Sequence, residues 1–88
     1  MKFVISGNLL RFSDFKNQIE ILEPTVEEGL AVLVASFPAL GPVLFGGAGR
    51  FREVHRIFLN GEQLTREELC RDVGIDDEVT ILTAIARG

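Results

Sequence analysis

The sequence predicts an α+β fold in which a mixed β-sheet packs against one main helix, with a second short helix nearby. Alternating apolar residues, which are typical of strands, occur near both ends of the chain. Between them, apolar residues recur at helical spacing behind a capping pattern. A length of 88 residues allows one small domain, and 47% apolar with 25% charged residues argues against disorder.

Two strands are predicted in the first quarter of the chain. Phe3 and Ile5 alternate with outward positions over residues 2–6, and Ile19 and Ile21 do so over residues 17–22. The intervening segment, 9–15, is interpreted as a hairpin connection. The two strands are therefore expected to pair antiparallel.

The main helix is predicted to begin after Thr25. Thr25 and Glu28 have the spacing of a capping box, and Pro38 cannot continue a helix. Apolar residues recur on one face at Leu30, Leu33, Val34 and Phe37. This face is expected to pack on one side of the sheet against Phe3, Ile5, Ile21, Ile57, Val79 and Ile81.

A glycine-rich loop is predicted over residues 39–53, followed by a hairpin. In the strand 54–59, Ile57 and Leu59 are expected to face inward and Arg56 and Phe58 outward. Asn60-Gly61 is a strong two-residue turn signal because both positions tolerate positive φ. Residues 62–64 form the predicted return strand.

The last part of the sequence predicts a short helix and a final strand. Thr65 and Glu68 repeat the capping spacing, and the helix is expected to end at Gly74 with Leu69 and Val73 inward. The strand 78–85 would turn Val79 and Ile81 inward and Leu82 outward. The order ββαββ, short helix, β is that of the β-grasp or ubiquitin-like architecture, with the first and last strands parallel at the centre. We expect one domain over residues 1–85 and a flexible tail over 86–88.

Charge and composition limit the partners and the compartment. The net charge of −4 argues against nucleic acid, although Arg50, Arg52 and Arg56 gather locally as a partner surface or a solvated loop. The single cysteine, Cys70, suits a reducing compartment. The N-terminus does not look like a signal peptide, and no segment is apolar enough for a membrane span. A cytoplasmic protein without a membrane partner is expected.

The sequence contains no visible catalytic constellation. The segment Gly46-Gly47-Ala48-Gly49 lacks the ending of a phosphate loop. One Cys and one His cannot make a structural zinc site. Cys70 is expected to be a small buried residue, and His55 a strand-end residue. An enzyme that acts alone is therefore not expected, whereas outward Arg56, Phe58 and Leu82 are expected to form a docking face.

Three segments together carry a family resemblance over nearly the whole chain: residues 25–40, the sequence HRIFLNGE at 55–62, and DDEVTILTAIARG at 76–88. They resemble the MoaD/ThiS family of ubiquitin-like sulfur carriers. The length and the long glycine-containing loop look more like the molybdopterin synthase small subunit or the cysteine-forming sulfur carrier than the shorter thiamine carrier.

The resemblance implies a carrier rather than an enzyme. An E1-like partner would use ATP to adenylate the carboxylate of Gly88, and sulfur would replace AMP to give a thiocarboxylate. The sulfur would pass to a synthase in cofactor or cysteine biosynthesis, with the molybdopterin type favoured. No cofactor would be bound to the carrier itself. The residues implied to contact partners are Arg56, Phe58, Leu82, Ala84, Ile85, Ala86 and Arg87.

The sequence departs from the family pattern close to its end. Arg87 stands where the family has the first glycine of a Gly-Gly pair, and Thr83 stands where it has proline. Arg87 adds bulk and charge beside the reactive position. Two alternatives to a sulfur carrier follow: an interaction module that has lost the terminal chemistry, and a protein modifier that joins Gly88 to lysines.

Overall fold

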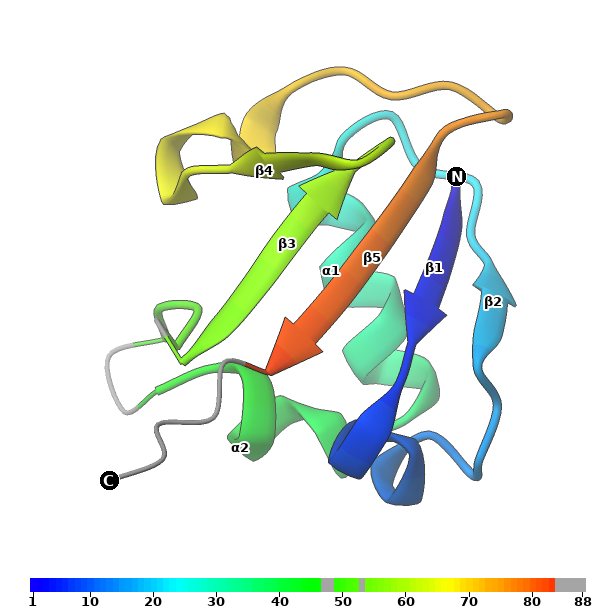
Figure 1. Cartoon of the computed structure of the whole chain (residues 1–88), viewed down its shortest axis with the longest axis vertical. Helices are drawn as coiled ribbons and strands as arrows, with labels where there is room; N and C mark the ends of the chain where they lie inside the picture. The colour runs from blue at the N-terminus through cyan, green and yellow to red at the C-terminus, as the bar shows by residue number, and fades with distance from the viewer. Residues whose placement is uncertain (47–48, 53, 84–88) are drawn as a thin grey trace.

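The computed structural model describes residues 1–46, 49–52 and 54–83. These residues form short strands, the main helix α1 and three shorter helices (Figure 1). In chain order they are β1 (Lys2–Ile5), the 3-10 helix η1 (Gly7–Phe12), β2 (Gln18–Glu20), α1 (Val26–Ser36), α2 (Leu40–Leu44), β3 (His55–Leu59), β4 (Glu62–Leu64), the 3-10 helix η2 (Arg66–Cys70) and β5 (Glu78–Thr83).

The strands form a mixed sheet in the order β2-β1-β5-β3-β4. The central strand β5 runs parallel to β1, as predicted, and it runs antiparallel to β3 (Figure 1). The register aligns inward-facing residues across these strands: Ile81 of β5 pairs with both Ile5 of β1 and Ile57 of β3. Aligned apolar rows of this kind fix the register, because a slip of one residue would expose the whole set.

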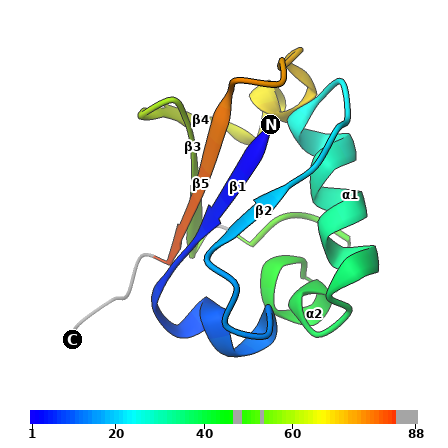
Figure 2. The same ribbon diagram turned by 90° about the vertical axis from the view of Figure 1, so that its right-hand side faces the viewer.

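Helix α1 covers one face of the sheet, and α2 lies on the same side (Figure 2). The predicted N-cap is confirmed, since Oγ1 of Thr25 accepts a hydrogen bond from the backbone N–H of Glu28 at 3.1 Å. Leu30 and Leu33 are fully buried, as predicted. Phe37 is only half-buried, because it is the C-cap residue, where the helical path ends.

The core lies between α1 and the sheet and contains the six residues that were expected to meet the helix, of which Ile21 lies directly after β2 and the others lie in strands. A close approach at Gly29 brings α1 down onto β1: a Cβ there would overlap Cε of Met1 and lie 3.0 Å from Cε2 of Phe3. The buried apolar side chains are Met1, Phe3, Ile5, Leu9, Ile21, Val26, Leu30, Leu33, Leu40, Leu44, Phe51, Ile57, Leu59, Leu64, Leu69, Val79 and Ile81.

Several local predictions need correction. The segment predicted as a hairpin connection, 9–15, does join the antiparallel strands β1 and β2, but most of it belongs to the 3-10 helix η1. The predicted loop 39–53 contains α2, which buries Leu40 and Leu44 against the core. The predicted helix after Thr65 is the 3-10 helix η2, and it ends at Cys70, well before Gly74.

The prediction that Cys70 is buried was wrong. In η2, Leu69 turns into the core while Cys70 is exposed, and the Sγ of Cys70 donates to the carbonyl of Glu67 at 3.3 Å.

The predicted Asn60-Gly61 turn is confirmed, with φ of 51° and 89°. In the described part of the chain, no helix is both long and apolar enough to cross a membrane.

Candidate functional site

The candidate site is built around β5, because the sequence continues from this central strand into residues 84–88. A hydrogen-bond network fixes the start of the strand. The side-chain amide of Asn60 donates to Oδ1 of Asp77 at 3.0 Å and accepts from the backbone N–H of Glu78 at 2.9 Å. The N–H of Gly74 donates to Oδ2 of Asp77 at 2.7 Å. The bond from Gly74 and then that from Asn60 lower the pKa of Asp77 below its ordinary value.

A buried histidine anchors the other end of β5. Nε2 of His55 lies 2.7 Å from the carbonyl oxygen of Val43 in α2, and Nδ1 lies 3.0 Å from Oγ1 of Thr83. A carbonyl can only accept, so Nε2 carries a proton and donates to Val43, while the hydroxyl of Thr83 can pair with Nδ1 as either donor or acceptor. His55 therefore links the end of β5 to α2.

Aromatic packing holds this histidine in place. The ring of Phe51 lies edge-on to the imidazole of His55, with centroids 5.9 Å apart, and edge-on to Phe45 at 5.7 Å. His55 is only 7% exposed. Sequence reasoning predicted a strand-end residue at His55 but missed this anchor. The sequence carries no direct signal for it, because His55 and Thr83 meet only through the pairing of β3 with β5.

The predicted reactive end lies outside the described residues. Gly88 was expected to be the reacting group, and the segment formed by Ala84, Ile85, Ala86 and Arg87 was expected to contact partners. The boundary between a domain over 1–85 and a tail over 86–88 falls in the same segment. These assignments therefore stay predictions, and the described strand ends at Thr83.

The other three predicted contact residues share the sheet face opposite α1, and we call this surface the open face. Arg56 pairs with Leu82, and Phe58 pairs with Thr80, across β3 and β5. Leu82 is 40% exposed and Phe58 is half-buried. Phe58 and Leu82 are diagonal neighbours on adjacent strands, a relationship that usually separates backbones by about 7–8 Å. The outward parity predicted for both residues is confirmed.

The open face has a largely uncharged centre and charged ends. Across the sheet, Val4 pairs with Thr80, which in turn pairs with Phe58. At one end, Lys2 pairs with both Glu20 and Glu78, so opposite charges face each other on neighbouring strands. At the other end, Arg56 stands beside Leu82. A neutral centre with a charged border is typical of a protein-docking surface.

The described residues do not assemble a nucleophile or metal centre. Both ring nitrogens of His55 already have partners, and Cys70 bonds within η2, so the two do not form a reactive pair. Over residues 1–46, 49–52 and 54–83, no three His, Cys, Asp or Glu side chains are grouped to hold a metal ion. The described site is thus the open face beside the end of the central strand β5.

Known proteins resemble this chain in structure rather than in sequence. No protein-family model and no curated protein matches the sequence. The solution structure of small archaeal modifier protein 1 from Methanosarcina acetivorans matches with a TM-score of 0.86 and 22% identity, over 99% of this chain and 94% of that chain.

Two crystal structures match similarly well. Small archaeal modifier protein 1 from Haloferax volcanii gives a TM-score of 0.83 and 21% identity, over 99% of this chain and 97% of that chain. A chain of the BexX/CysO complex from Amycolatopsis orientalis gives 0.84 and 21%, over 99% and 98%. This chain therefore has the β-grasp, ubiquitin-like fold.

Proposed function

We propose that this chain is a ubiquitin-like sulfur carrier that acts through the C-terminal carboxylate of Gly88. The observation that supports it best is the position of β5. This strand is central in the sheet, is paired on both sides and is tied at Thr83 to His55. A rigid strand of this kind, followed by the short segment 84–88, suits delivery of a terminal carboxylate into the active site of a partner.

The proposed chemistry belongs mainly to that partner. An E1-like enzyme directs the Gly88 carboxylate onto the α-phosphorus of ATP and expels pyrophosphate, so that the acyl group gains AMP as a good leaving group. Sulfide from a sulfur donor then attacks the acyl carbon, forms the C–S bond and displaces AMP, which leaves a thiocarboxylate. Glycine suits this role because the absence of Cβ lets the chain enter a narrow channel. The carrier is thus not itself an enzyme, and the ATP is bound by the partner.

The proposed partners are the activating enzyme and a synthase that accepts the sulfur. Arg56, Phe58 and Leu82 of the open face would dock on both, together with residues 84–87. A synthase of the molybdopterin type is the acceptor that we favour, with cysteine formation as the other. With either acceptor, the carrier would act in the cytoplasm.

Protein modification is the second candidate. Small archaeal modifier protein 1, from two archaea, is among the solved structures that match over nearly the whole chain, and its name describes a modifier. In this role Gly88 would form an isopeptide bond with a lysine of a target. A third candidate, an interaction module without terminal chemistry, is favoured by Arg87, which replaces the first glycine of the usual ending.

The intact mass of the protein, purified from its native host, separates these roles. A mass increase that matches exchange of one oxygen for sulfur supports the carrier. Covalent adducts on other proteins that depend on Gly88 support the modifier. If the mass is unchanged under every growth condition and no adducts form, the interaction module is the role that remains of the three.

A further inference from the structure

The turn between η1 and β2 holds an aromatic ring in solvent. Phe15 is 75% exposed, the largest value among the exposed large apolar residues that the structure describes. Its backbone is left-handed, with φ of 60°, and so is that of Asp14, with φ of 57°. Aspartate tolerates such angles, but they are costly for a bulky side chain such as that of phenylalanine. An exposed ring on a strained backbone adds little to folding, which points to binding as its role.

Hydrogen bonds around Ser13 fix the shape of this turn. The side chain of Ser13 is buried, and its Oγ lies 3.2 Å from the carbonyl oxygen of Leu10 and 3.0 Å from that of Lys16. The backbone N–H of Phe15 donates to the carbonyl of Leu10 at 2.8 Å, and the N–H of Lys16 donates to the carbonyl of Ser13 at 3.0 Å. The backbone that carries the ring of Phe15 is therefore held in one conformation.

The turn lies at the end of the sheet where β5 ends. The N–H of Ile5, the last residue of β1, donates to the carbonyl of Asn17 at 2.9 Å. Ile5 in turn pairs with Ile81 in the last part of β5. Figures 1 and 2 show η1 and α2 at this same end of the molecule.

Two exposed basic residues flank the ring. Arg11 lies in the last turn of η1, and Lys16 directly follows Phe15. Nζ of Lys16 lies 6.0 Å from the ring centroid of Phe37, the C-cap residue of α1. Lys16 therefore turns toward the helical side of the sheet, away from the open face. We call Arg11, Phe15 and Lys16 the turn surface.

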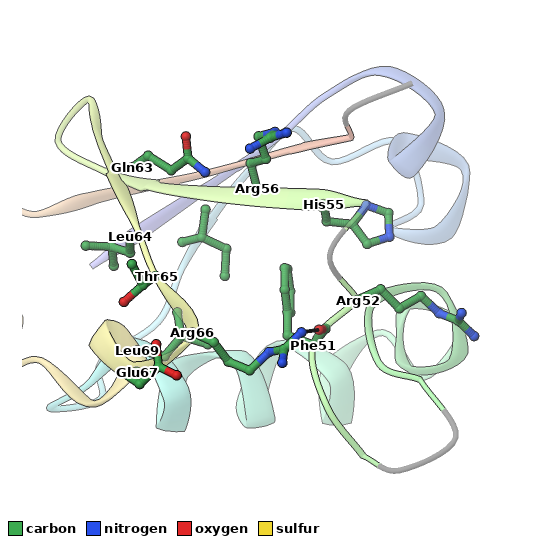
Figure 3. Close-up of a pocket in the computed structure, with 11 residues that line it drawn as sticks. Phe51, Arg52, His55, Arg56, Gln63, Leu64, Thr65, Arg66, Glu67 and Leu69 are labelled. Atoms are coloured by element: carbon green, nitrogen blue, oxygen red, sulfur yellow. Dashed lines mark hydrogen bonds between the residues drawn. The ribbon is translucent and has the colours of Figure 1, made fainter. Parts of the chain in front are cut away.

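Charge is divided between the two ends of the molecule. Near the end of β5 lie the exposed basic residues Arg11, Lys16, Arg52 and Arg56, and Asp14 is the acidic residue that the structure describes there. The Nε of Arg52 donates to the carbonyl of Pro42 in α2 at 3.1 Å. Arg52 and Arg56 both turn away from the hollow beside β3, β4 and η2 (Figure 3).

The opposite end, where β5 begins, is acidic. Lys2, Arg66 and Arg71 offset only part of the negative charge there. The acidic residues described at or toward this end are Glu20, Glu23, Glu27, Glu28, Glu62, Glu67, Glu68, Asp72, Asp76, Asp77 and Glu78. The turn surface thus lies at the basic end of a chain whose net charge is −4.

We infer that the turn surface binds a partner protein, with the ring of Phe15 in an apolar pocket and carboxylates of the partner on Arg11 and Lys16. An aromatic anchor supplies buried area, and opposite charge supplies orientation, because the acidic end of this chain is repelled by the same partner. A membrane fits less well, since anionic lipids repel an acidic chain and one ring buries little apolar surface. This binding does not use Gly88 and goes beyond the proposed carrier function.

Photocrosslinking from position 15 in the native host tests the inference. Benzoylphenylalanine replaces Phe15 in one chain and Leu22 in a matched control chain. Leu22 is 70% exposed and lies toward the acidic end. After irradiation and digestion, mass spectrometry identifies the crosslinked peptide. The expected result is a protein that is crosslinked from position 15 and not from position 22, at a site that combines apolar and acidic side chains.

The purified partner found in this way then allows the affinity to be measured. Phe15→Gly should raise the Kd about tenfold. It should not lower the denaturant midpoint, because glycine adopts a positive φ without strain. This pair of measurements separates a role in binding from a role in folding.

The charged residues are tested with a matched substitution at each end. Arg11→Gln should raise the Kd about threefold, and Arg11→Gln with Lys16→Gln about tenfold. Affinity of the unmodified protein should fall as salt rises. Arg71→Gln removes the same group from the acidic end and should change the Kd less than about twofold.

Each other outcome overturns the inference. Position 15 may crosslink no more than position 22, or crosslink to lipid or nucleic acid, and either result would remove the protein partner. A crosslinked site without acidic residues, or equal effects of Arg11→Gln and Arg71→Gln, would remove the role of charge. A lower denaturant midpoint for Phe15→Gly would mean that the ring serves the fold. A chain without Gly88 should bind with the same Kd, so the result stands or falls separately from the carrier function.

Discussion

Nδ1 of His55 lies 3.0 Å from Oγ1 of Thr83, so the first residue of β3 holds the last residue of β5. The imidazole is buried, and its other nitrogen is bonded to Val43. Losing the hydroxyl of Thr83 would leave Nδ1 without its partner in a site that water enters poorly. This pair is therefore expected to contribute to stability and to set where the segment 84–88 begins.

Thr83→Val should lower the free energy of unfolding by about 1 kcal/mol, because valine keeps the shape but not the hydroxyl. Denaturant unfolding measures this loss. Thr80→Val is the control: Thr80 is half-buried in the same strand but faces the open side of the sheet. Equal losses in the two variants would show that the bond to His55 contributes nothing of its own.

Leu33→Ala should lower the free energy of unfolding by about 2–5 kcal/mol, because the side chain is fully buried between α1 and the sheet and leaves a cavity. Leu22→Ala removes the same atoms from a residue that is 70% exposed and should cost far less. Denaturant midpoints of both variants give the comparison. A small loss for Leu33→Ala would contradict the packing described for α1.

The predictable parts of this fold were those with a regular pattern. The helical spacing of Leu30 and Leu33 gave the correct face of α1, and alternation in β3 and β5 gave the correct parity of Phe58 and Leu82. The five-residue helix α2 was missed because Leu40-Gly41-Pro42-Val43-Leu44 contains two residues that normally interrupt helices and is too short to show periodicity. Burial of Leu40 and Leu44 against the core stabilises it.

The candidate site was predictable only in part. Outward Arg56, Phe58 and Leu82 follow from strand parity, but the anchor between His55 and Thr83 depends on which strands are neighbours. Cys70 was misplaced because a helix of one or two turns does not reveal its phase in the sequence. Arg66 donates to the carbonyl oxygen of Phe51 from a separate segment, a contact that only the folded chain reveals.

Phe58→Ala should weaken binding to the activating enzyme about tenfold, since aromatic residues near the centre of an interface often dominate its affinity. Calorimetric titration with that enzyme measures the change. Leu22→Ala, an exposed apolar truncation beyond the end of the edge strand β2, is the control and should bind like the unmodified protein. Unchanged affinity of Phe58→Ala would remove the open face from the docking surface.

Asp77 should make the protein sensitive to acid. Because its pKa is lowered in the folded state, its carboxylate adds stability above the ordinary aspartate pKa of about 3.9, and this stability is lost as the pH falls through the folded value. Asp77→Asn should therefore show a shallower fall of unfolding free energy between neutral and acid pH. In Asn60→Gly, glycine tolerates the positive φ but cannot donate the side-chain hydrogen bond to Asp77. This variant should therefore show a fall of unfolding free energy between those of the parent and Asp77→Asn. If the unfolding free energy fell equally with pH in the parent, Asp77→Asn and Asn60→Gly, Asp77 would not be the source of the acid sensitivity.

Arg87 is expected to set which enzyme activates the carrier. If its side chain obstructs the channel of an activating enzyme built for Gly-Gly endings, Arg87→Gly should speed adenylation by that enzyme. If a dedicated enzyme of the host pairs Arg87 with an acidic group, the same variant should react more slowly there. Pyrophosphate release gives both rates, and equal rates with both enzymes would mean that Arg87 has no part in recognition.

The central claim is that Gly88 becomes a thiocarboxylate. The most direct measurement is the intact mass of the protein after incubation with the host's activating enzyme, ATP and a sulfur donor. The account predicts a mass increase equal to exchange of one oxygen for one sulfur, and no increase for a chain that lacks Gly88 but unfolds like the parent. Absence of sulfur from both the native protein and Arg87→Gly, with every candidate activating enzyme of the host, would contradict it.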